Sequence, residues 1–185
     1  MNKYIVYSDG SCKGTTVKHG GWAAIICDNQ EQIVNEIYGS LNNTTSQRME
    51  LRAAIEGLKA IKEPSEIKII SDSQYLVSTI NDNWLPRILK GSGNFANIDL
   101  WEKMARLLEY HNVSLRWTKG HADNKMNNRA DKLAQFAATV LNAPDDEYIN
   151  NGKESREPLV SELEAWRSDG SYTGQKNGEV LYSLG

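Results

Sequence analysis

The chain has 185 residues, of which 39% are hydrophobic and 24% are charged, a balance typical of a soluble globular protein with one domain and some extra length. No apolar run is long enough to span a membrane, and the start of the chain lacks the form of a signal peptide, so we expect a cytoplasmic protein. Cys12 and Cys27 are the only cysteines, which excludes a disulfide framework and favours free, buried or half-buried thiols.

The formal net charge of −3 argues at first against a nucleic-acid ligand. The charges are divided unevenly, however. Residues 142–185 hold nine acids and four bases, which leaves 15 acids and 17 bases in residues 1–141. The main part of the chain is therefore mildly basic and its end is acidic. Phosphate contacts depend on local clusters rather than on bulk charge, so this balance is weak evidence for a polyanionic partner.

Strand patterns dominate the first part of the chain. An apolar, aromatic run at residues 4–7 ends at Asp9-Gly10, and two more runs follow at residues 21–27 and 32–38. Three strands with short links predict an antiparallel meander. Apolar residues then repeat at helical spacing over residues 51–61, preceded by a capping signal in which Gln47 lies three residues after Thr44.

The second part of the chain alternates between helix and strand patterns. The expected elements are a buried strand at 67–70, helices at 73–80 and 98–110, a strand at 113–117 and a last helix at 130–141. Segment 81–96 contains Pro86, Gly91 and Gly93 and is expected to be irregular. The order β-β-β-α-β-α-α-β-α predicts an α/β sheet with helices packed on it.

The character of the sequence changes after Leu141. Residues 144–147 interrupt the helix, and the remainder is polar and turn-rich, with one short helix conceivable from Pro158 to Trp166. We therefore divide the chain into a domain of residues 1–141 and an acidic C-terminal extension of residues 142–185 that is partly flexible. The extension could bind a partner, contribute to a dimer or act as a spacer, and the sequence leaves these roles open.

Four carboxylates lie at the predicted ends of strands or within helices: Asp9, Glu50, Asp72 and Asp131. In an open α/β sheet the ends of central strands and the adjoining helices form one crevice, where such residues can meet. Carboxylates brought together repel one another and need cations, and hard oxygen ligands suit Mg²⁺ or Mn²⁺. Two such ions about 3.5–4 Å apart could hold a scissile phosphate and activate a water.

A single Asp or Glu is usually solvated or caps a helix, so the short sequences around the four acids are more informative. They are, in order, Asp9-Gly10-Ser11-Cys12, Arg48-Met49-Glu50-Leu51, Ser71-Asp72-Ser73-Gln74-Tyr75 and Lys119-Gly120-His121-Ala122, followed by Asn127, Arg129 and Asp131. Together they closely resemble bacterial ribonuclease H type 1 over residues 3–138. One of them alone would be weak evidence, but the ordered set is specific.

The resemblance implies a ribonuclease H-like fold, with a five-stranded mixed sheet flanked by helices. It implies an endonuclease that hydrolyses the RNA strand of RNA–DNA hybrids by two-metal-ion catalysis, leaving 5′-phosphate and 3′-hydroxyl ends. The metal ligands for two Mg²⁺ ions, with Mn²⁺ as a substitute, would be Asp9, Glu50, Asp72 and Asp131. On a mobile loop, His121 would assist proton movement or product release. Substrate contacts would come from Ser11, Cys12, Lys13, Thr45, Ser46, Gln47 and Gln74.

Several positions depart from the family's pattern. Ser46 stands where Asn is usual, and the loop at residues 14–21 lacks the family's Asn-Pro-Gly-Pro form. The family's basic protrusion is thin here, because segment 81–96 keeps Trp84 but has only Arg87 and Lys90 as basic residues. Each lost phosphate contact weakens binding, so we expect lower hybrid affinity than in a relative with the full protrusion.

Two other functions remain open from the sequence. The chain could be a different nuclease on the same fold, since fold alone does not exclude that. It could also be a catalytically silent module that binds hybrids, although the presence of all four carboxylates argues against a dead site. We expect a monomer that binds an RNA–DNA hybrid and no membrane, with an extension that could mediate protein contacts.

Overall fold

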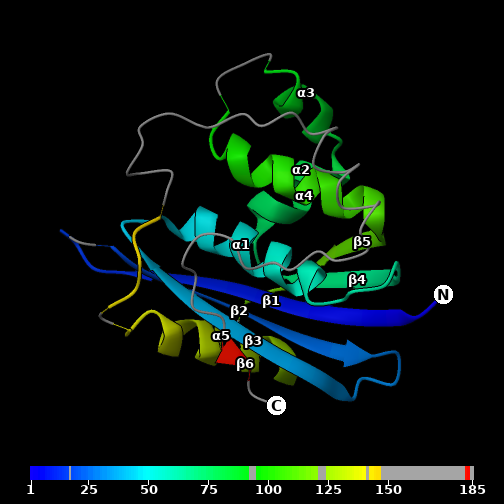
Figure 1. Ribbon diagram of the computed structural model, residues 1–185, viewed down its shortest axis with the longest axis horizontal. Helices are drawn as coiled ribbons and strands as arrows, with labels where there is room; N and C mark the ends of the chain where they lie inside the picture. The colour runs from blue at the N-terminus through cyan, green and yellow to red at the C-terminus, as the bar shows by residue number, and fades with distance from the viewer. Residues whose placement is uncertain (17, 92–94, 121–123, 141, 147–181, 184–185) are drawn as a thin grey trace.

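A mixed β-sheet with helices on both faces forms the centre of the molecule (Figure 1). The computed structural model describes residues 1–16, 18–91, 95–120, 124–140, 142–146 and 182–183. The elements in chain order are β1 (Lys3–Lys13), β2 (His19–Asp28), β3 (Ile33–Asn42), α1 (Ser46–Lys59), β4 (Glu66–Ser71), α2 (Gln74–Asn81), α3 (Leu85–Leu89), α4 (Ile98–Tyr110), β5 (Asn112–Trp117), α5 (Lys125–Ala137) and β6 (Tyr182–Ser183).

The strand order in the sheet is β5-β4-β1-β2-β3-β6. Strands β1, β2 and β3 form the predicted antiparallel meander, while β4 pairs parallel to β1, and β5 parallel to β4. These five strands confirm the predicted five-stranded mixed sheet with flanking helices. The two-residue strand β6 was not predicted, and it pairs with β3 at the edge of the sheet.

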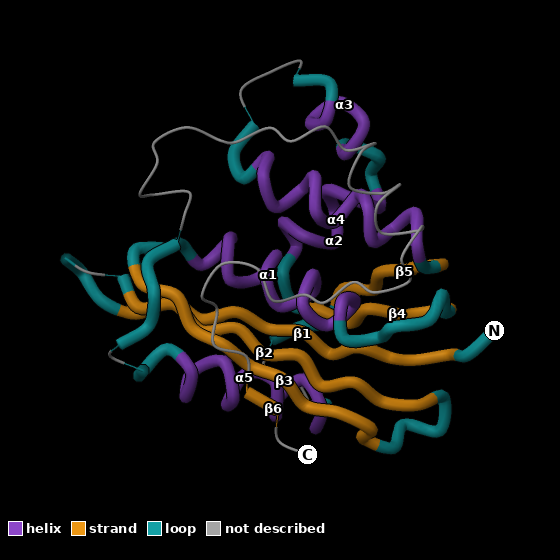
Figure 2. Tube along the Cα trace, in the orientation of Figure 1, coloured by secondary structure: helices purple, strands orange, loops and turns teal. Residues whose placement is uncertain are grey.

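The two faces of the sheet are covered by different helices (Figure 2). Helix α1 packs over β1 and β2 on one face, with α2, α3 and α4 beyond it, and α5 covers the opposite face. Successive residues of β1 point to opposite faces, so Val6 joins the large core under α1 and Tyr7 joins the smaller core under α5. In the part of the chain described, no helix combines the length and the hydropathy needed to cross a membrane.

Several local predictions were wrong. The last helix, expected over residues 130–141, is α5 and spans Lys125–Ala137. The first strand does not end at Asp9-Gly10: β1 continues to Lys13, because its later residues pair with β2 as far as His19. The segment expected to be irregular contains α3, in which Pro86 lies in the first turn, where a missing N–H costs nothing. Helix α1 is capped by Thr45, which accepts a hydrogen bond from the Arg48 N–H, rather than by the residue before it.

Both cysteines are free, Cys12 half-buried and Cys27 buried, as predicted. The described start of the extension packs on the domain. The carbonyl of Pro144 accepts a hydrogen bond from the Asn42 N–H at 2.8 Å, and the N–H of Asp146 donates to the Asn42 carbonyl at 2.8 Å. The division of the chain after residue 141 stays a prediction, as does the short helix from Pro158 to Trp166, which lies outside the described residues.

A buried histidine joins the end of α1 to the beginning of β5. The His111 Nδ1 accepts a hydrogen bond from the Ser65 N–H at 3.2 Å, and its Nε2 lies 3.2 Å from the Leu58 carbonyl. The imidazole is therefore neutral, with its proton on Nε2. Burial lowers the pKa of His111, against the opposing effect of the Leu58 and Ile61 carbonyls. The sequence assigned this residue no role.

We expect the wild type to lose stability relative to a variant without the His111 imidazole as the pH decreases from 7 to 5. The unfolded chain binds a proton at His111 near its ordinary pKa of about 6.5, whereas the folded protein resists protonation there. As the pH falls below the pKa of the unfolded state, that state gains a proton at His111 before the folded state does. The free energy of unfolding therefore decreases by up to about 1.4 kcal/mol per pH unit. Urea unfolding of the wild type and of His111→Gln at pH 7, 6 and 5 checks this. The same pH dependence of stability in the two proteins would contradict the assignment to His111.

Candidate active site

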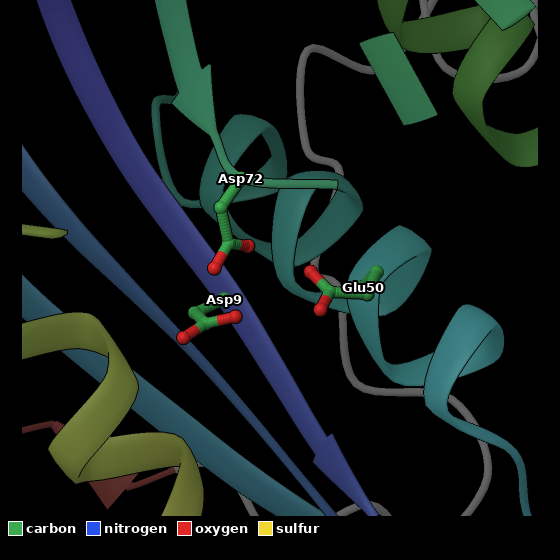
Figure 3. Close-up of side chains that lie close together, drawn as sticks. All are labelled: Asp9, Glu50 and Asp72. Carbon is green, nitrogen blue, oxygen red and sulfur yellow. The ribbon is translucent and has the colours of Figure 1, made fainter. Parts of the chain in front are cut away.

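Three carboxylates from distant parts of the chain meet beside strand β1, at the point where the neighbouring β4 has ended (Figure 3). Asp9 belongs to β1, Glu50 to the first turns of α1, and Asp72 follows β4 directly. One oxygen from each lies within 4.8 Å of the others. The arrangement follows from the fold, because the parallel register pairs Tyr7 with Ile70, and two residues further along these chains come Asp9 and Asp72.

Gly10 brings the third carboxylate to the other two. A Cβ on Gly10 would lie 2.4 Å from the Glu50 nitrogen and 2.5 Å from the Met49 carbonyl carbon. Contacts this short are not tolerated, so only glycine lets the backbone of α1 approach β1 here. The Gly10 N–H also donates a hydrogen bond to the Asp9 Oδ1 at 2.9 Å. Gly10 thus orients the Asp9 carboxylate and lets Glu50 approach it.

The carboxylates sit where a negative charge is costly. Burial raises the pKa of Asp9 to about 8, helped by the charge of Asp72 and by the neighbouring Asp131, and opposed by the Gly10 N–H. Burial, followed by the charges of Asp9 and Asp72, raises the pKa of Glu50 well above its usual value. Without a counterion, these groups favour protonation over shared ionisation.

The fourth predicted acid adjoins this group. Asp131 lies on α5, on the opposite face of the sheet, and it acts on Asp9 through a side-chain hydrogen bond and through its charge. Its Oδ2 also accepts a hydrogen bond from the Gln135 side chain at 2.9 Å. The structure thus places all four predicted carboxylates in one region, three clustered and the fourth beside Asp9.

These residues fit hard divalent cations. All the candidate ligand atoms are carboxylate oxygens, which suit Mg²⁺ or Mn²⁺. The Glu50 Oε2 is buried, and it finds no hydrogen-bond donor within the described residues. A bound cation would supply the missing partner and offset the mutual repulsion of the acids.

The predicted substrate contacts lie on two segments that approach each other. Ser11, Cys12 and Lys13 form the end of β1, and the exposed Thr45, Ser46 and Gln47 begin α1. The Cys12 Sγ lies 3.8 Å from the Thr44 carbonyl, which joins the two segments. Gln74 is exposed at the start of α2. Exposure suits a ligand surface, and the contacts themselves stay predictions.

Three other residues named in the sequence analysis are His121, Arg129 and Trp84. His121 lies outside the described residues, so its role stays a prediction. Arg129 forms an ion pair with Glu36 of β3 that ties α5 to the sheet. Trp84 is 42% exposed and packs against Arg87 and Phe95, so it is not a core residue.

Sequence reasoning missed the contacts that surround Asp72. The Trp117 Nε1 donates a hydrogen bond to the Asp72 carbonyl at 3.0 Å, and Gly120 lies against the Asp72 carboxylate. Gly120 belongs to the sequence Lys119-Gly120-His121-Ala122, and Trp117 lies two residues before it. Only the pairing of β4 with β5 shows what these two residues contact. No signal in the sequence alone would have identified the tryptophan.

Comparison with known proteins gives consistent results. The sequence model of the RNase H family matches residues 1–139. A ribonuclease H of Chlorobium phaeobacteroides is 45% identical over 143 residues, which cover 74% of this chain and 96% of that protein. A ribonuclease H of Caldicellulosiruptor saccharolyticus is 38% identical over 141 residues, covering 73% of this chain and 95% of the relative.

Solved structures show the same fold. LC9-RNase H1, described as a type 1 RNase H with the type 2 active-site motif, superposes with a TM-score of 0.64 and 26% identity, covering 88% of this chain and 85% of its own. The prototype foamy virus protease-reverse transcriptase has a TM-score of 0.67 and 26% identity, and it matches 76% of this chain but 21% of its own. The likeness therefore concerns one part of the viral protein and most of LC9-RNase H1.

Proposed function

Because the chain belongs to the ribonuclease H family, we propose that it is an endonuclease that uses divalent metal ions to hydrolyse the RNA strand of RNA–DNA hybrids. The observation that carries the proposal is the cluster of Asp9, Glu50 and Asp72, with oxygens within 4.8 Å of one another. Its chemistry suits metal-assisted phosphodiester hydrolysis, since the cluster contains acids and no nucleophilic side chain is required.

The residues of the chain have distinct roles in this proposal. Bound divalent cations would activate a water for attack on the scissile phosphate and stabilise the leaving oxygen, which gives 5′-phosphate and 3′-hydroxyl ends. Asp9, Glu50, Asp72 and Asp131 would hold the cations. The Gly10 N–H fixes the Asp9 Oδ1, so that the carboxylate does not have to reorganise when the ions and the substrate arrive.

Hybrid recognition is assigned to the exposed polar groups beside the cluster. Ser11, Cys12 and Lys13 on β1 and Thr45, Ser46 and Gln47 at α1 would contact sugars and phosphates, with Gln74 as a further contact. Contacts to 2′-hydroxyl groups would distinguish the RNA strand from DNA. His121 would assist proton movement or product release.

Mg²⁺ is the proposed metal, with Mn²⁺ as a substitute, and the cytoplasm is the proposed location. The catalytic domain comprises residues 1–141 and acts as a monomer, while residues 142–185 are an extension available for protein contacts.

The metal requirement tests the mechanism. We expect cleavage of an end-labelled hybrid with Mg²⁺ or Mn²⁺, none with EDTA, and full recovery when Mg²⁺ is added back. The products should carry 3′-hydroxyl ends, which polyadenylation by a template-independent polymerase detects. Undiminished cleavage in EDTA, or products ending in a 3′-phosphate, would refute a mechanism that depends on this carboxylate cluster.

A further inference from the structure

Trp117 ends β5, and its side chain reaches across to the point where the chain leaves β4. The indole Nε1–H donates a hydrogen bond to the backbone carbonyl of Asp72 at 3.0 Å, although the residue is 43% exposed. The indole has one polar hydrogen, and here it is given to a single carbonyl. This side chain is therefore held in one place at the surface rather than by burial in the core.

Two further contacts from the same segment surround Asp72. The Thr118 N–H donates a hydrogen bond to the Ser71 carbonyl at 2.9 Å. A Cβ on Gly120 would lie 3.0 Å from the Asp72 Oδ2 and 3.8 Å from its Cβ and Cγ, so Gly120 lies directly against this carboxylate. Residues 117–120 thus contact the peptide groups on both sides of the Asp72 Cα as well as its side chain.

Asp72 needs this support more than its partners do. Asp9 is inside β1 and Glu50 is inside α1, so regular hydrogen bonding fixes their backbones. Asp72 is the single residue between the end of β4 and Ser73, the N-cap of α2. Its backbone has two soft dihedral angles, and the direction of its carbonyl reports one of them. A donor held at that carbonyl restricts the rotation that would move the carboxylate.

We propose that Trp117 is a positioning residue for the metal site: its indole N–H fixes the backbone of Asp72, and Gly120 leaves the room that the Asp72 carboxylate occupies. The inference rests on the proposed function in that it takes Asp72 to be a metal ligand. Groups that orient metal ligands typically change metal affinity by about 10- to 100-fold when removed. Because Trp117 acts on the backbone rather than on the carboxylate itself, we place its effect near the lower value.

Trp117→Phe distinguishes hydrogen bonding to the Asp72 backbone from a second possible role of an exposed indole, which is to stack on a base or sugar. Phenylalanine keeps an aromatic face but has no N–H. Trp84→Phe is the matched control, since Trp84 is also exposed, at 42%, and packs against Arg87 and Phe95, which do not belong to the carboxylate cluster. Gly120→Ala is a second variant that perturbs the same carboxylate from the side-chain direction.

The experiment titrates Mn²⁺ into the full chain without substrate and follows binding by calorimetry and by the EPR signal of free Mn²⁺. We expect Trp117→Phe and Gly120→Ala to raise the dissociation constant about tenfold, while Trp84→Phe binds as the wild type does. With hybrid present, Trp117→Phe should lower kcat at subsaturating Mn²⁺, recover at high Mn²⁺ and leave KM for the hybrid unchanged.

Wild-type Mn²⁺ affinity in Trp117→Phe would overturn the proposal, as would a raised KM for the hybrid with unchanged Mn²⁺ binding. If Trp117→Phe does not fold, Gly120→Ala decides by the same titration. The binding measurement needs no substrate, so a failure of the proposed activity is distinguishable: the wild type would then bind Mn²⁺ without cutting the hybrid.

Discussion

Replacing Asp9 by asparagine is expected to reduce hybrid cleavage at least about 1,000-fold, which corresponds to about 4 kcal/mol of activation free energy. Asp9 is 3% exposed, and it is the carboxylate that the other three approach. An amide of the same shape keeps one oxygen but loses the charge that a divalent cation requires. Single-turnover cleavage of a labelled hybrid measures the loss.

The same substitution should stabilise the protein when no metal is present. Burial and the neighbouring acids penalise the ionised form of Asp9, and asparagine removes that penalty at nearly constant volume. We expect the free energy of unfolding in EDTA to rise by about 1–2 kcal/mol, as measured by urea denaturation. Asp82→Asn, at the exposed C-cap of α2, is the control and should change neither stability nor rate appreciably. Loss of activity accompanied by loss of stability in Asp9→Asn would point to a folding defect instead.

Asp146→Asn is expected to lower the free energy of unfolding by about 3–5 kcal/mol, because it disrupts a buried ion pair by neutralising one partner. The Arg48 Nε donates to the Asp146 Oδ2 and its Nη2 donates to the Asp146 Oδ1, each at 2.8 Å. Both side chains are 1% exposed. The Thr44 hydroxyl donates to the same carboxylate at 2.7 Å, and Asp99 accepts from the other side of the guanidinium.

This network also determines how the stability responds to acid. Burial alone would raise the pKa of Asp146, but the hydrogen bonds and charge of Arg48, with Thr44, outweigh it and lower the pKa. The ionised Asp146 therefore contributes stability above its ordinary pKa of about 3.9. This contribution is lost as the pH falls through the lower pKa of the folded state.

The neighbouring residue provides a matched control for this prediction. Asp145 is exposed, and its carboxylate accepts one side-chain hydrogen bond from Asn43 at 2.9 Å, so Asp145→Asn should cost less than about 1 kcal/mol. Urea unfolding at pH 7 compares the two variants. Equal losses would show that Asp146 does not anchor the chain to α1. The expected difference would mean that Asp146, at the described start of the extension, stabilises the domain through Arg48 and Thr44.

The sequence predicted elements best where one periodic pattern governed a whole segment. Helix α4 has the predicted bounds, because its apolar residues keep helical spacing from Ile98 to Leu107 and face the core. Helix α3 was missed because Pro86 reads as a helix breaker, although a proline in the first turn is compatible with a helix. The end of β1 was misplaced because Asp9-Gly10 resembles a turn, whereas Gly10 serves a close approach of α1.

The candidate site was predictable to the extent that it depends on short sequences in a known order. Asp9, Glu50, Asp72 and Asp131 were chosen on that basis, and the structure brings them to one region. Contacts between side chains far apart in the chain carry no such local signal. The bond from Trp117 to the Asp72 carbonyl depends on the register that pairs Ser71 with the tryptophan, and no periodicity encodes a register.

The most direct test of the proposed function is a substrate panel in one sequence: an RNA–DNA hybrid with each strand labelled in turn, double-stranded RNA, double-stranded DNA and both single strands, each with Mg²⁺. We expect cleavage of the RNA strand of the hybrid alone, at internal positions, and none of it by Asp9→Asn. Cleavage of double-stranded DNA or RNA at a similar rate would indicate a different nuclease on this fold. Intact hybrid with both Mg²⁺ and Mn²⁺ would contradict the assignment of this protein as a hybrid-cutting enzyme.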